Sequence, residues 1–240
     1  MELAGKTAIV TGGGRGLGRA IALAYARAGA NVVVAARSAD EVAETAWLIE
    51  ELGQFTLAVP TDVRDPAQIA HLVAQADQRF GNVTILVNSA GVGLRAPVTE
   101  TSETQWDAVV DTLLKGPYLV AQAVIPLMTA AGGGNIINIG APLERIAVPG
   151  FGAYYAAKAG IEGLSKIMAK ELRRYGINVN ILHPGGFADT RMVRETVPEV
   201  TKGLLNPDEI GAAALALAVE PPRGRTGQVI DAHTWETLQR

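Results

Sequence analysis

The sequence predicts an α/β fold in which a doubly wound parallel sheet of about seven strands is flanked by helices. Short runs of β-branched and apolar residues alternate with longer segments of helical periodicity, an order typical of parallel sheets. A glycine cluster joins the first strand to the first helix. The chain is 48% hydrophobic but only 5% aromatic. Small aliphatic residues therefore supply the core, as suits strands covered on both faces.

Length and composition limit the class of protein further. The 240 residues suffice for a single domain over 1–240, and no linker divides them. A formal net charge of −3 without long runs of one sign argues against nucleic acid and anionic membrane partners. Cysteine is absent and the three histidines are scattered, so we expect no disulfide and no metal site. We find no targeting segment or apolar run of membrane-spanning length and expect a cytoplasmic protein.

The first unit, residues 7–37, organises the rest of the chain. An apolar run, a glycine cluster, an alanine-rich segment and a second apolar run predict strand, tight turn, helix and strand. Glycines let the backbone approach a ligand closely, and a helix starting there offers free N–H groups to a phosphate. The glycines at 12, 16 and 18 do not follow the common G-x-G-x-x-G spacing. Taken alone, this turn is either a phosphate cradle or a simple connection.

Later elements follow the same alternation. Strands are expected at 7–11, 31–37, 55–59, 84–87, 135–139, 177–182 and 226–230. Beyond the first helix, helices are expected at 39–52, 67–80, 104–131, 152–175 and 207–218. Pro117 and Pro126 should bend the longest helix. No periodicity persists from Phe187 to Asn206, which predicts a mobile loop that covers the substrate.

The end of the second strand bears on cofactor choice. NAD-dependent proteins place a carboxylate there for the ribose hydroxyls, but this strand ends at Arg37 and the first carboxylate is Asp40. Arg37 and Arg15 could instead meet a 2′-phosphate, so we expect NADP(H) in preference to NAD(H). The alternative is two solvated arginines. Asp62, after the third strand, either accepts the adenine amino group or caps the turn before Pro66.

Tyr154 and Lys158 are four residues apart, so they share one face of the helix 152–175. A phenol with a pKa near 10 is a poor base at neutral pH. A neighbouring ammonium and an oxidised nicotinamide ring would favour the phenolate and make Tyr154 a proton donor and acceptor. Such a pair also arises often on amphipathic helices without any function.

Four motifs in order carry a family resemblance: Thr11-Gly12-x-x-x-Gly16-x-Gly18, Asn88-Ser89-Ala90-Gly91, Tyr154-x-x-x-Lys158 and Pro184-Gly185. Together they resemble the short-chain dehydrogenase/reductase family over essentially the whole chain. The resemblance implies one Rossmann-like domain, an NAD(P)(H) site at the strand ends, a carbonyl or alcohol substrate of low molecular weight, and a homodimer or homotetramer. It also implies that Tyr154 transfers the proton, while Lys158 binds the nicotinamide ribose and lowers the pKa of the tyrosine.

The residues expected to bind the cofactor come from the glycine turn, the strand ends and the tyrosine helix. They are Gly12, Gly14, Arg15, Gly16, Leu17, Gly18, Arg37, Asp62, Val63, Asn88, Ala90, Gly91, Tyr154, Lys158, Pro184, Gly185 and Thr190. Family members place a threonine one position earlier than Thr190, where this chain has Asp189.

Two further positions depart from the family pattern. The serine that hydrogen-bonds the substrate oxygen is replaced by Ala141, and the asparagine of the long helix is replaced by Leu113. Removing one preorganised donor typically slows a reaction about 10²–10³-fold. The active site is therefore atypical, and another group must orient the substrate oxygen. Asn138 and a backbone N–H near Gly140 are the candidates.

Three functions remain compatible with these residues. The first is an NADP(H)-dependent oxidoreductase that transfers hydride between nicotinamide and a carbonyl or alcohol carbon. The second is a catalytically weakened NADP(H)-binding subunit with a regulatory or structural role. The third is a non-redox reaction such as dehydration. Polar residues on the expected substrate wall are Arg95, Glu144 and Arg145.

Overall fold

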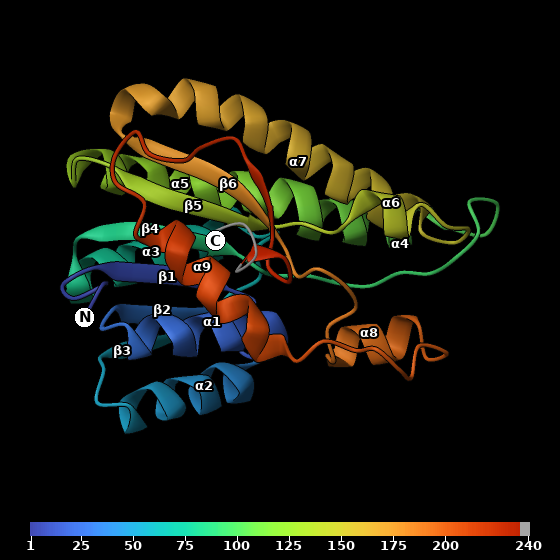
Figure 1. The fold of residues 1–240 in the computed structure, drawn as a ribbon, viewed down its shortest axis with the longest axis horizontal. Helices are drawn as coiled ribbons and strands as arrows, with labels where there is room; N and C mark the ends of the chain where they lie inside the picture. The colour runs from blue at the N-terminus through green and yellow to red at the C-terminus, as the bar shows by residue number, and fades with distance from the viewer. Residues whose placement is uncertain (236–240) are drawn as a thin grey trace.

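The computed structural model describes residues 1–235 (Figure 1). Its seven strands form one sheet in the order β3-β2-β1-β4-β5-β6-β7, and all neighbouring strands are parallel. The strands are β1 (Thr7–Thr11), β2 (Asn31–Ala36), β3 (Thr56–Pro60), β4 (Val83–Asn88), β5 (Gly134–Ile139), β6 (Ile177–His183) and β7 (Val229–Asp231). The predicted fold class is confirmed.

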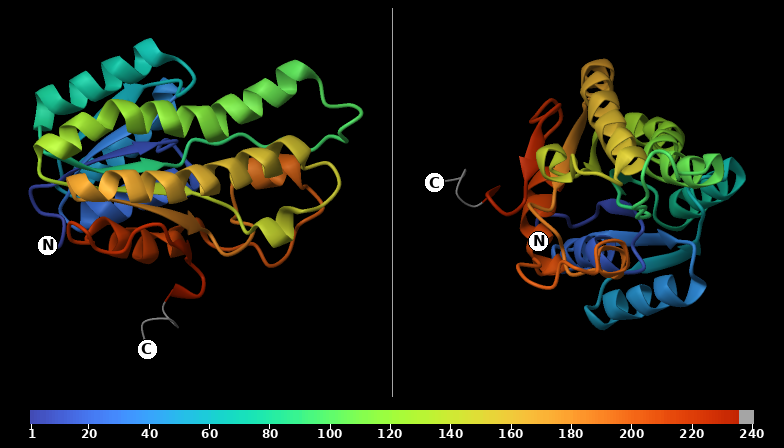
Figure 2. Two further views of the ribbon diagram at one scale, coloured as in Figure 1. Left: turned by 90° about the horizontal axis from the view of Figure 1, so that it is seen from above. Right: turned by 90° about the vertical axis from the view of Figure 1, so that its right-hand side faces the viewer.

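Helices cover both faces of this sheet. They are α1 (Gly16–Arg27), α2 (Ala39–Glu51), α3 (Pro66–Phe80), α4 (Glu103–Val110), α5 (Gly116–Ala130), α6 (Leu143–Ile146), α7 (Gly152–Leu172), α8 (Arg191–Thr196) and α9 (Ile210–Ala218). Buried residues of α1, α2 and α9 pack on one face, and those of α3, α5 and α7 pack on the other. Figure 2 shows α3, α5 and α7 lying side by side over their face.

Successive side chains of each strand point to opposite faces of the sheet, and this alternation creates the two cores. Ala8 and Val10 of β1 contact the α1 side, whereas Ile9 between them contacts the α5 side, because successive side chains of a strand point to opposite faces. All three are fully buried. As the sequence predicted, small aliphatic residues form strands that are covered on both faces.

The strand order reverses between β1 and β4, which creates a crevice at their carboxyl ends. Thr11 closes β1 there, and its hydroxyl donates to the carbonyl of Val87 at 3.3 Å and accepts from the N–H groups of Ser89 and Ala90 at 3.2 and 3.3 Å. Thr11 thus joins the start of the glycine turn to the Asn88-Ser89-Ala90-Gly91 loop. The two motifs form one edge of the crevice.

The long helical stretch is interrupted in its middle. A π-helical turn, Asp111–Lys115, separates α4 from α5, whose second residue is Pro117. Pro117 lacks the N–H that would continue the ladder, so the irregularity lies where a bend was expected. Pro126 lies inside α5.

The same stretch corrects one expectation from composition. Glu103–Ala130 is 28 residues long with a hydropathy of 1.3 in its most apolar window, which is long and apolar enough to cross a membrane. Val120, Val124 and Met128 are fully buried against the sheet. Since core helices pass the same test, this single helix is weak evidence for a membrane span.

Residues 187–206 correct a second expectation, because they contain structure that periodicity did not reveal. Helix α8 begins after Thr190, whose hydroxyl accepts from the N–H of Val193 at 3.3 Å, and Ala188 pairs with Leu205 in a parallel bridge. Val193 and Val197 pack against Phe151, far away in the sequence. A six-residue helix held by distant contacts leaves too short a pattern to recognise.

Two smaller differences have similar causes. Helix α6 occupies four residues of the segment expected to be a loop, and β7 begins at Val229 instead of Thr226. The Thr226 hydroxyl accepts from the N–H of Val179, and the Gln228 carbonyl accepts from that of Ile181. The residues before β7 are therefore bonded to β6 without forming a regular strand.

Candidate active site

A cavity of about 560 Å³ lies at the carboxyl ends of the strands, within the size range of cofactor and ligand sites. Fifteen of the seventeen expected cofactor residues line it: Gly12, Gly14, Arg15, Gly16, Leu17, Gly18, Arg37, Asp62, Val63, Ala90, Gly91, Tyr154, Lys158, Pro184 and Thr190. The fold thus brings together motifs that are up to 178 residues apart, from Gly12 to Thr190.

Asn88 and Gly185 are not on the cavity wall. The Asn88 side chain is buried, and its Nδ2 donates to Asn138 Oδ1 at 2.8 Å. Gly185 has a φ of +88°, and a Cβ there would lie 2.4 Å from the Cβ of His233. Both residues shape the ends of strands behind the cavity, so direct contact with a cofactor stays a prediction for them.

The glycine turn is a cradle that side chains would fill. Gly12 has a φ of +65°, and a Cβ there would lie 2.6 Å from the carbonyl oxygen of Ser89. A Cβ on Gly18 would lie 2.2 Å from the carbonyl oxygen of Gly12. The side chain of Arg15, the N-cap residue, makes no capping hydrogen bond to α1, whose first residues line the cavity. Free N–H groups at a helix start are suited to the diphosphate of a dinucleotide.

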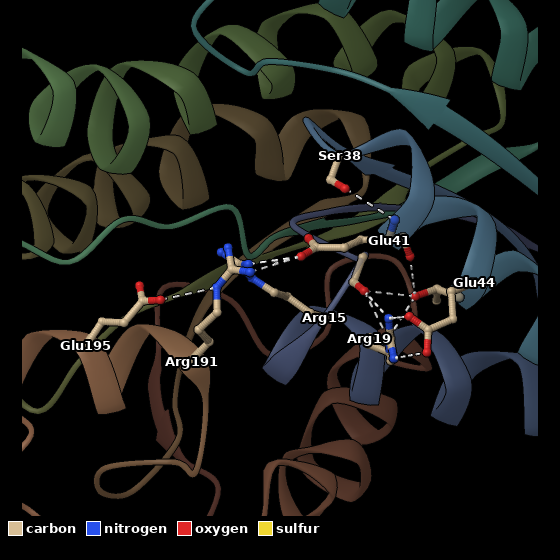
Figure 3. A network of polar contacts seen from close by, with 9 residues as sticks. Arg15, Arg19, Ser38, Glu41, Glu44, Arg191 and Glu195 are labelled. Carbon is tan, nitrogen blue, oxygen red and sulfur yellow. Dashed lines mark hydrogen bonds and ion pairs between the residues drawn. The ribbon is translucent and has the colours of Figure 1, made fainter.

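Acidic and basic residues meet at the far end of this turn. Arg15 Nη1 lies 3.0 Å from Glu41 Oε1, and Arg191 Nη1 of α8 lies 3.5 Å from the same oxygen (Figure 3). Arg37 is exposed on the cavity wall and makes no ion pair or side-chain hydrogen bond within residues 1–235.

Sequence reasoning missed Glu41 and Arg191. Glu41 is an acidic residue in the first turn of α2, a position that acidic residues often occupy because of the helix dipole, so it carries no specific signal of a site. Arg191 had no such signal, because its helix was not predicted.

The Asp62 carboxylate stabilises the turn that follows β3. Its Oδ1 accepts from the backbone N–H of Arg64 at 3.0 Å, and its Oδ2 from the Arg64 guanidinium at 2.6 Å. These bonds hold the pKa of the Asp62 carboxyl below its usual value, so the group is ionised at neutral pH. Asp62 therefore caps the turn and also faces the cavity, where its oxygens remain acceptors.

Lys158 is buried beneath the cavity, with 7% of its surface exposed. Its Nζ donates to the carbonyl oxygen of Ile139 at 2.6 Å and lies 5.7 Å from the centroid of the Tyr154 ring. Burial lowers the pKa of Lys158 to about 8, so most of it is still cationic at pH 7.

Tyr154 is partly buried on the same wall, packed edge-on against Phe151 with ring centroids 6.1 Å apart. Burial raises the pKa of Tyr154 to about 12, which is opposite to the direction that proton transfer needs. The cation of Lys158 and a positively charged nicotinamide ring are the groups that would oppose this shift.

Apolar side chains occupy the two positions at which the family resemblance leads one to expect a serine and an asparagine. Ala141 lines the cavity, and Leu113, which is 2% exposed, packs with Val109, Ala153 and Ala157 from its place in the π-helical turn. The Asn138 side chain donates to Ser165 Oγ at 2.8 Å and accepts from Asn88.

The Asn138 side chain therefore has partners at both ends, and the Gly140 N–H donates to the carbonyl oxygen of Leu182 at 3.0 Å. Neither group is free to orient a substrate. The next N–H, that of Ala141, has no acceptor in the part of the chain that the structure describes. A backbone donor beside Gly140 thus remains available on the cavity wall.

The substrate side of the cavity is mainly apolar. Phe151, Val193 and Val197 pack together there. Of the three polar candidates, only Arg145 lines the cavity, and its guanidinium donates to the carbonyl oxygen of Gly185. Arg95 forms an ion pair with Glu199 instead.

Known proteins agree with this geometry. The family model for short chain dehydrogenase matches residues 6–201. The 3-oxoacyl-[acyl-carrier-protein] reductase FabG of Thermotoga maritima is 33% identical over 239 residues, which cover 96% of this chain and 97% of that protein. A short-chain type dehydrogenase/reductase of Picea abies is 37% identical over 195 residues, covering 78% of this chain and 72% of that protein.

Solved structures show the same fold. Carveol dehydrogenase from Mycobacterium avium, in complex with NAD, superimposes with a TM-score of 0.88 at 27% identity and covers 96% of both chains. A short-chain type dehydrogenase/reductase from Mycobacterium marinum gives a TM-score of 0.87 at 31% identity and covers 95% of this chain and 94% of its own. The chain therefore belongs to the short-chain dehydrogenase/reductase family, and it is an oxidoreductase by that membership.

Proposed function

We propose that the protein is an NADP(H)-preferring oxidoreductase that interconverts a carbonyl compound and an alcohol. The observation that carries this proposal is the placement of Tyr154 and Lys158 on one cavity with the uncapped start of α1. When bound, the nicotinamide cofactor supplies or accepts the hydride. The α1 N–H groups would hold its diphosphate, Lys158 its nicotinamide ribose and Thr190 its carboxamide.

The protein's own residues would handle the proton and the substrate oxygen. The Lys158 ammonium, fixed by the Ile139 carbonyl, stabilises the Tyr154 phenolate by its charge. The Tyr154 hydroxyl would give a proton to the carbonyl oxygen during reduction, and the Tyr154 phenolate would take one from the alcohol during oxidation. The Ala141 N–H takes the place of the missing serine hydroxyl as the donor that orients this oxygen.

The preference for NADP(H) rests on Arg15 and Arg37, whose side chains line the cavity beyond the glycine turn. Arg37 is exposed, and its guanidinium forms no ion pair or side-chain hydrogen bond within residues 1–235, so its donors are available to a 2′-phosphate. Glu41 argues in the other direction, because a carboxylate here can accept from the ribose 2′-hydroxyl of NAD(H). Its two arginine partners neutralise that carboxylate, which leaves the end of the cavity cationic.

Calorimetric titration with NADPH and NADH tests the cofactor proposal. We expect micromolar binding of NADPH and much weaker binding of NADH. Turnover on a panel of ketones, aldehydes and alcohols then tests the reaction. Absence of binding by either nucleotide would overturn the proposal as a whole, whereas binding without turnover would contradict only its catalytic part.

A catalytically weakened binding subunit is the second candidate, and the apolar side chains of Ala141 and Leu113 favour it. It predicts NADPH binding without turnover. A Leu113→Asn/Ala141→Ser double variant that gained carbonyl reduction from a silent background would support this candidate. The relatives that are named reductases and dehydrogenases favour the enzyme.

Other parts of the proposal concern the molecule as a whole. We propose one domain over residues 1–240, a cytoplasmic location, and assembly as a homodimer or homotetramer. The apolar substrate wall suits a carbonyl or alcohol of low molecular weight with a hydrophobic body. Size-exclusion chromatography with light scattering would determine the oligomer size.

A further inference from the structure

We propose that Arg191 of α8 is a third cation for the cofactor's 2′-phosphate, and that Glu41 is the carboxylate which this phosphate displaces. The inference rests on the proposed preference for NADP(H) and names further residues that create it. Arg191, Arg15 and Glu41 come from three different parts of the chain and all line the cavity.

One oxygen atom holds the two arginines together. Glu41 Oε1 lies 3.0 Å from Arg15 Nη1 and 3.5 Å from Arg191 Nη1, and Figure 3 shows both guanidiniums directed to this carboxylate. Arg191 Nε also lies 3.5 Å from Glu195, one turn further along α8. The Glu41 side chain is only 27% exposed, although it is charged.

The position of Arg191 does not depend on this ion pair alone. Thr190, which caps α8, lies against the glycine turn, where its Cγ2 would be 3.1 Å from a Cβ on Gly16. On the other side of α8, the buried Val193 packs in the cluster of Phe151. These contacts hold the beginning of α8 over the start of α1, so Arg191 stays at this end of the cavity.

The charges suit a phosphate better than the carboxylate that they now hold. Glu41 is the only carboxylate that contacts Arg15 within residues 1–235, Arg191 has the exposed Glu195 as a second partner, and Arg37 adds a third cation to the same wall. A phosphate monoester carries about −1.5 to −2 charges at pH 7 and offers three acceptor oxygens. Arginine forks bind such groups with two parallel hydrogen bonds. A 2′-phosphate would therefore take over both arginines and repel Glu41.

The Glu41 side chain can move without unfolding its helix. The backbone N–H of Glu41 donates to the Ser38 hydroxyl at 3.3 Å, which fixes the start of α2 independently of the carboxylate. With NAD(H) no phosphate arrives, so Glu41 keeps its arginines and can accept from the 2′-hydroxyl. Arg191 and Glu41 thus act in opposite directions on cofactor choice.

Arg191→Gln tests the role of Arg191, and calorimetry measures the affinity of the variant for NADPH and for NADH. We expect NADPH to bind roughly tenfold more weakly, since a charged hydrogen bond of this kind contributes about one such factor or more. NADH binding should change less than about twofold. Arg191 is exposed, so folding is not at risk, and the thermal midpoint serves to check this.

Arg194→Gln is the matched control. Arg194 lies on the same short helix but pairs with Asp189 and is not on the cavity wall. Its replacement removes one positive charge from α8 and should leave the NADPH to NADH affinity ratio unchanged. An equal loss in both variants would mean that only the overall charge of α8 matters, which would overturn the proposal.

Glu41→Gln tests the role of Glu41, and its effect on the ratio of NADPH to NADH affinity should be opposite to that of Arg191→Gln. The ratio of NADPH to NADH affinity should rise by about tenfold, because the variant loses a repulsion to phosphate and an acceptor for the 2′-hydroxyl. A fall in this ratio, or equal effects of Arg191→Gln on both nucleotides, would overturn the inference. A wild-type protein that prefers NADH would contradict the proposed cofactor preference instead, before any variant is made.

Discussion

The two halves of the cavity differ in how they are built. The diphosphate-binding part of the cofactor half is a short continuous stretch, β1 to α1, whose glycines approach backbone atoms of their own turn and of the loop after β4. The substrate half is assembled from α6, α7 and α8, which join through contacts such as Phe151 with Val193. Local backbone geometry determines the first half, whereas side-chain packing between distant segments determines the second. Substitutions should therefore disturb the cofactor half through folding and the substrate half through activity.

The largest effect on turnover is expected from a substitution that removes the reacting hydroxyl and leaves both halves of the cavity intact. Tyr154→Phe removes the hydroxyl that exchanges the proton and should reduce turnover about 10²–10⁴-fold. NADPH affinity should stay within about threefold, because the ring and its packing on Phe151 remain. Steady-state kinetics and calorimetry on the same samples test this. A variant with full activity would exclude Tyr154 from proton transfer.

The burial of Lys158 lowers the free energy of unfolding by an amount that depends on pH. Its folded pKa of about 8 lies below its ordinary value of 10.5, so the folded state disfavours the cation. Below pH 8 both states are protonated and the full cost applies, about 3 kcal/mol by the linkage relation. From pH 8 to 10.5 the unfolded state binds more protons, so stability rises with pH and the cost disappears above that range.

Lys158→Met should consequently be more stable than the wild type at pH 7, and this advantage should shrink as pH rises from 8 to 10.5. Urea unfolding of both proteins at several pH values measures the difference. Lys166→Met is the control, since Lys166 lies on α7 as well but is exposed and paired with Glu162. An advantage that does not vary with pH would mean that the methionine gains by packing, not by removing a buried charge.

Gly18→Ala tests whether the backbone of the glycine turn tolerates a side chain in the cofactor half. The new Cβ would lie 2.2 Å from the Gly12 carbonyl oxygen, so the turn must shift. We expect a loss of about 2 kcal/mol in stability, as for other overpacked sites, together with loss of NADPH binding. Gly163→Ala on α7 is the control, because nothing lies within 4 Å of its Cβ, and it should stabilise the helix by up to about 1 kcal/mol.

The smallest effect concerns the substrate half. Ala141→Ser restores a hydroxyl on the cavity wall, and turnover should rise about tenfold with little change in stability or NADPH affinity. Ala141→Val, which adds apolar bulk without a donor, should not raise it. If serine and valine had the same effect, the orientation of the substrate oxygen would not limit the reaction.

Much of the cofactor half could be predicted because its signals are local. The glycines, the apolar strand and the helix that follows are contiguous, and the spacing of Tyr154 and Lys158 places both on one helical face. The strand boundaries were within a few residues of the observed ones. Even here the sequence did not show that Glu41 returns from α2 to meet Arg15.

By itself, the sequence determined the alternation of elements, the two-sided aliphatic sheet, the glycine turn and the tyrosine-lysine pair, since each depends on neighbours within about four residues. Only the tertiary structure decided that Asn138 is already bonded, that the Ala141 N–H is free within residues 1–235, and that α8 carries Arg191 to Glu41. These facts depend on which distant segments pack together. Hydrogen bonds and ion pairs between such segments have no fixed spacing along the chain.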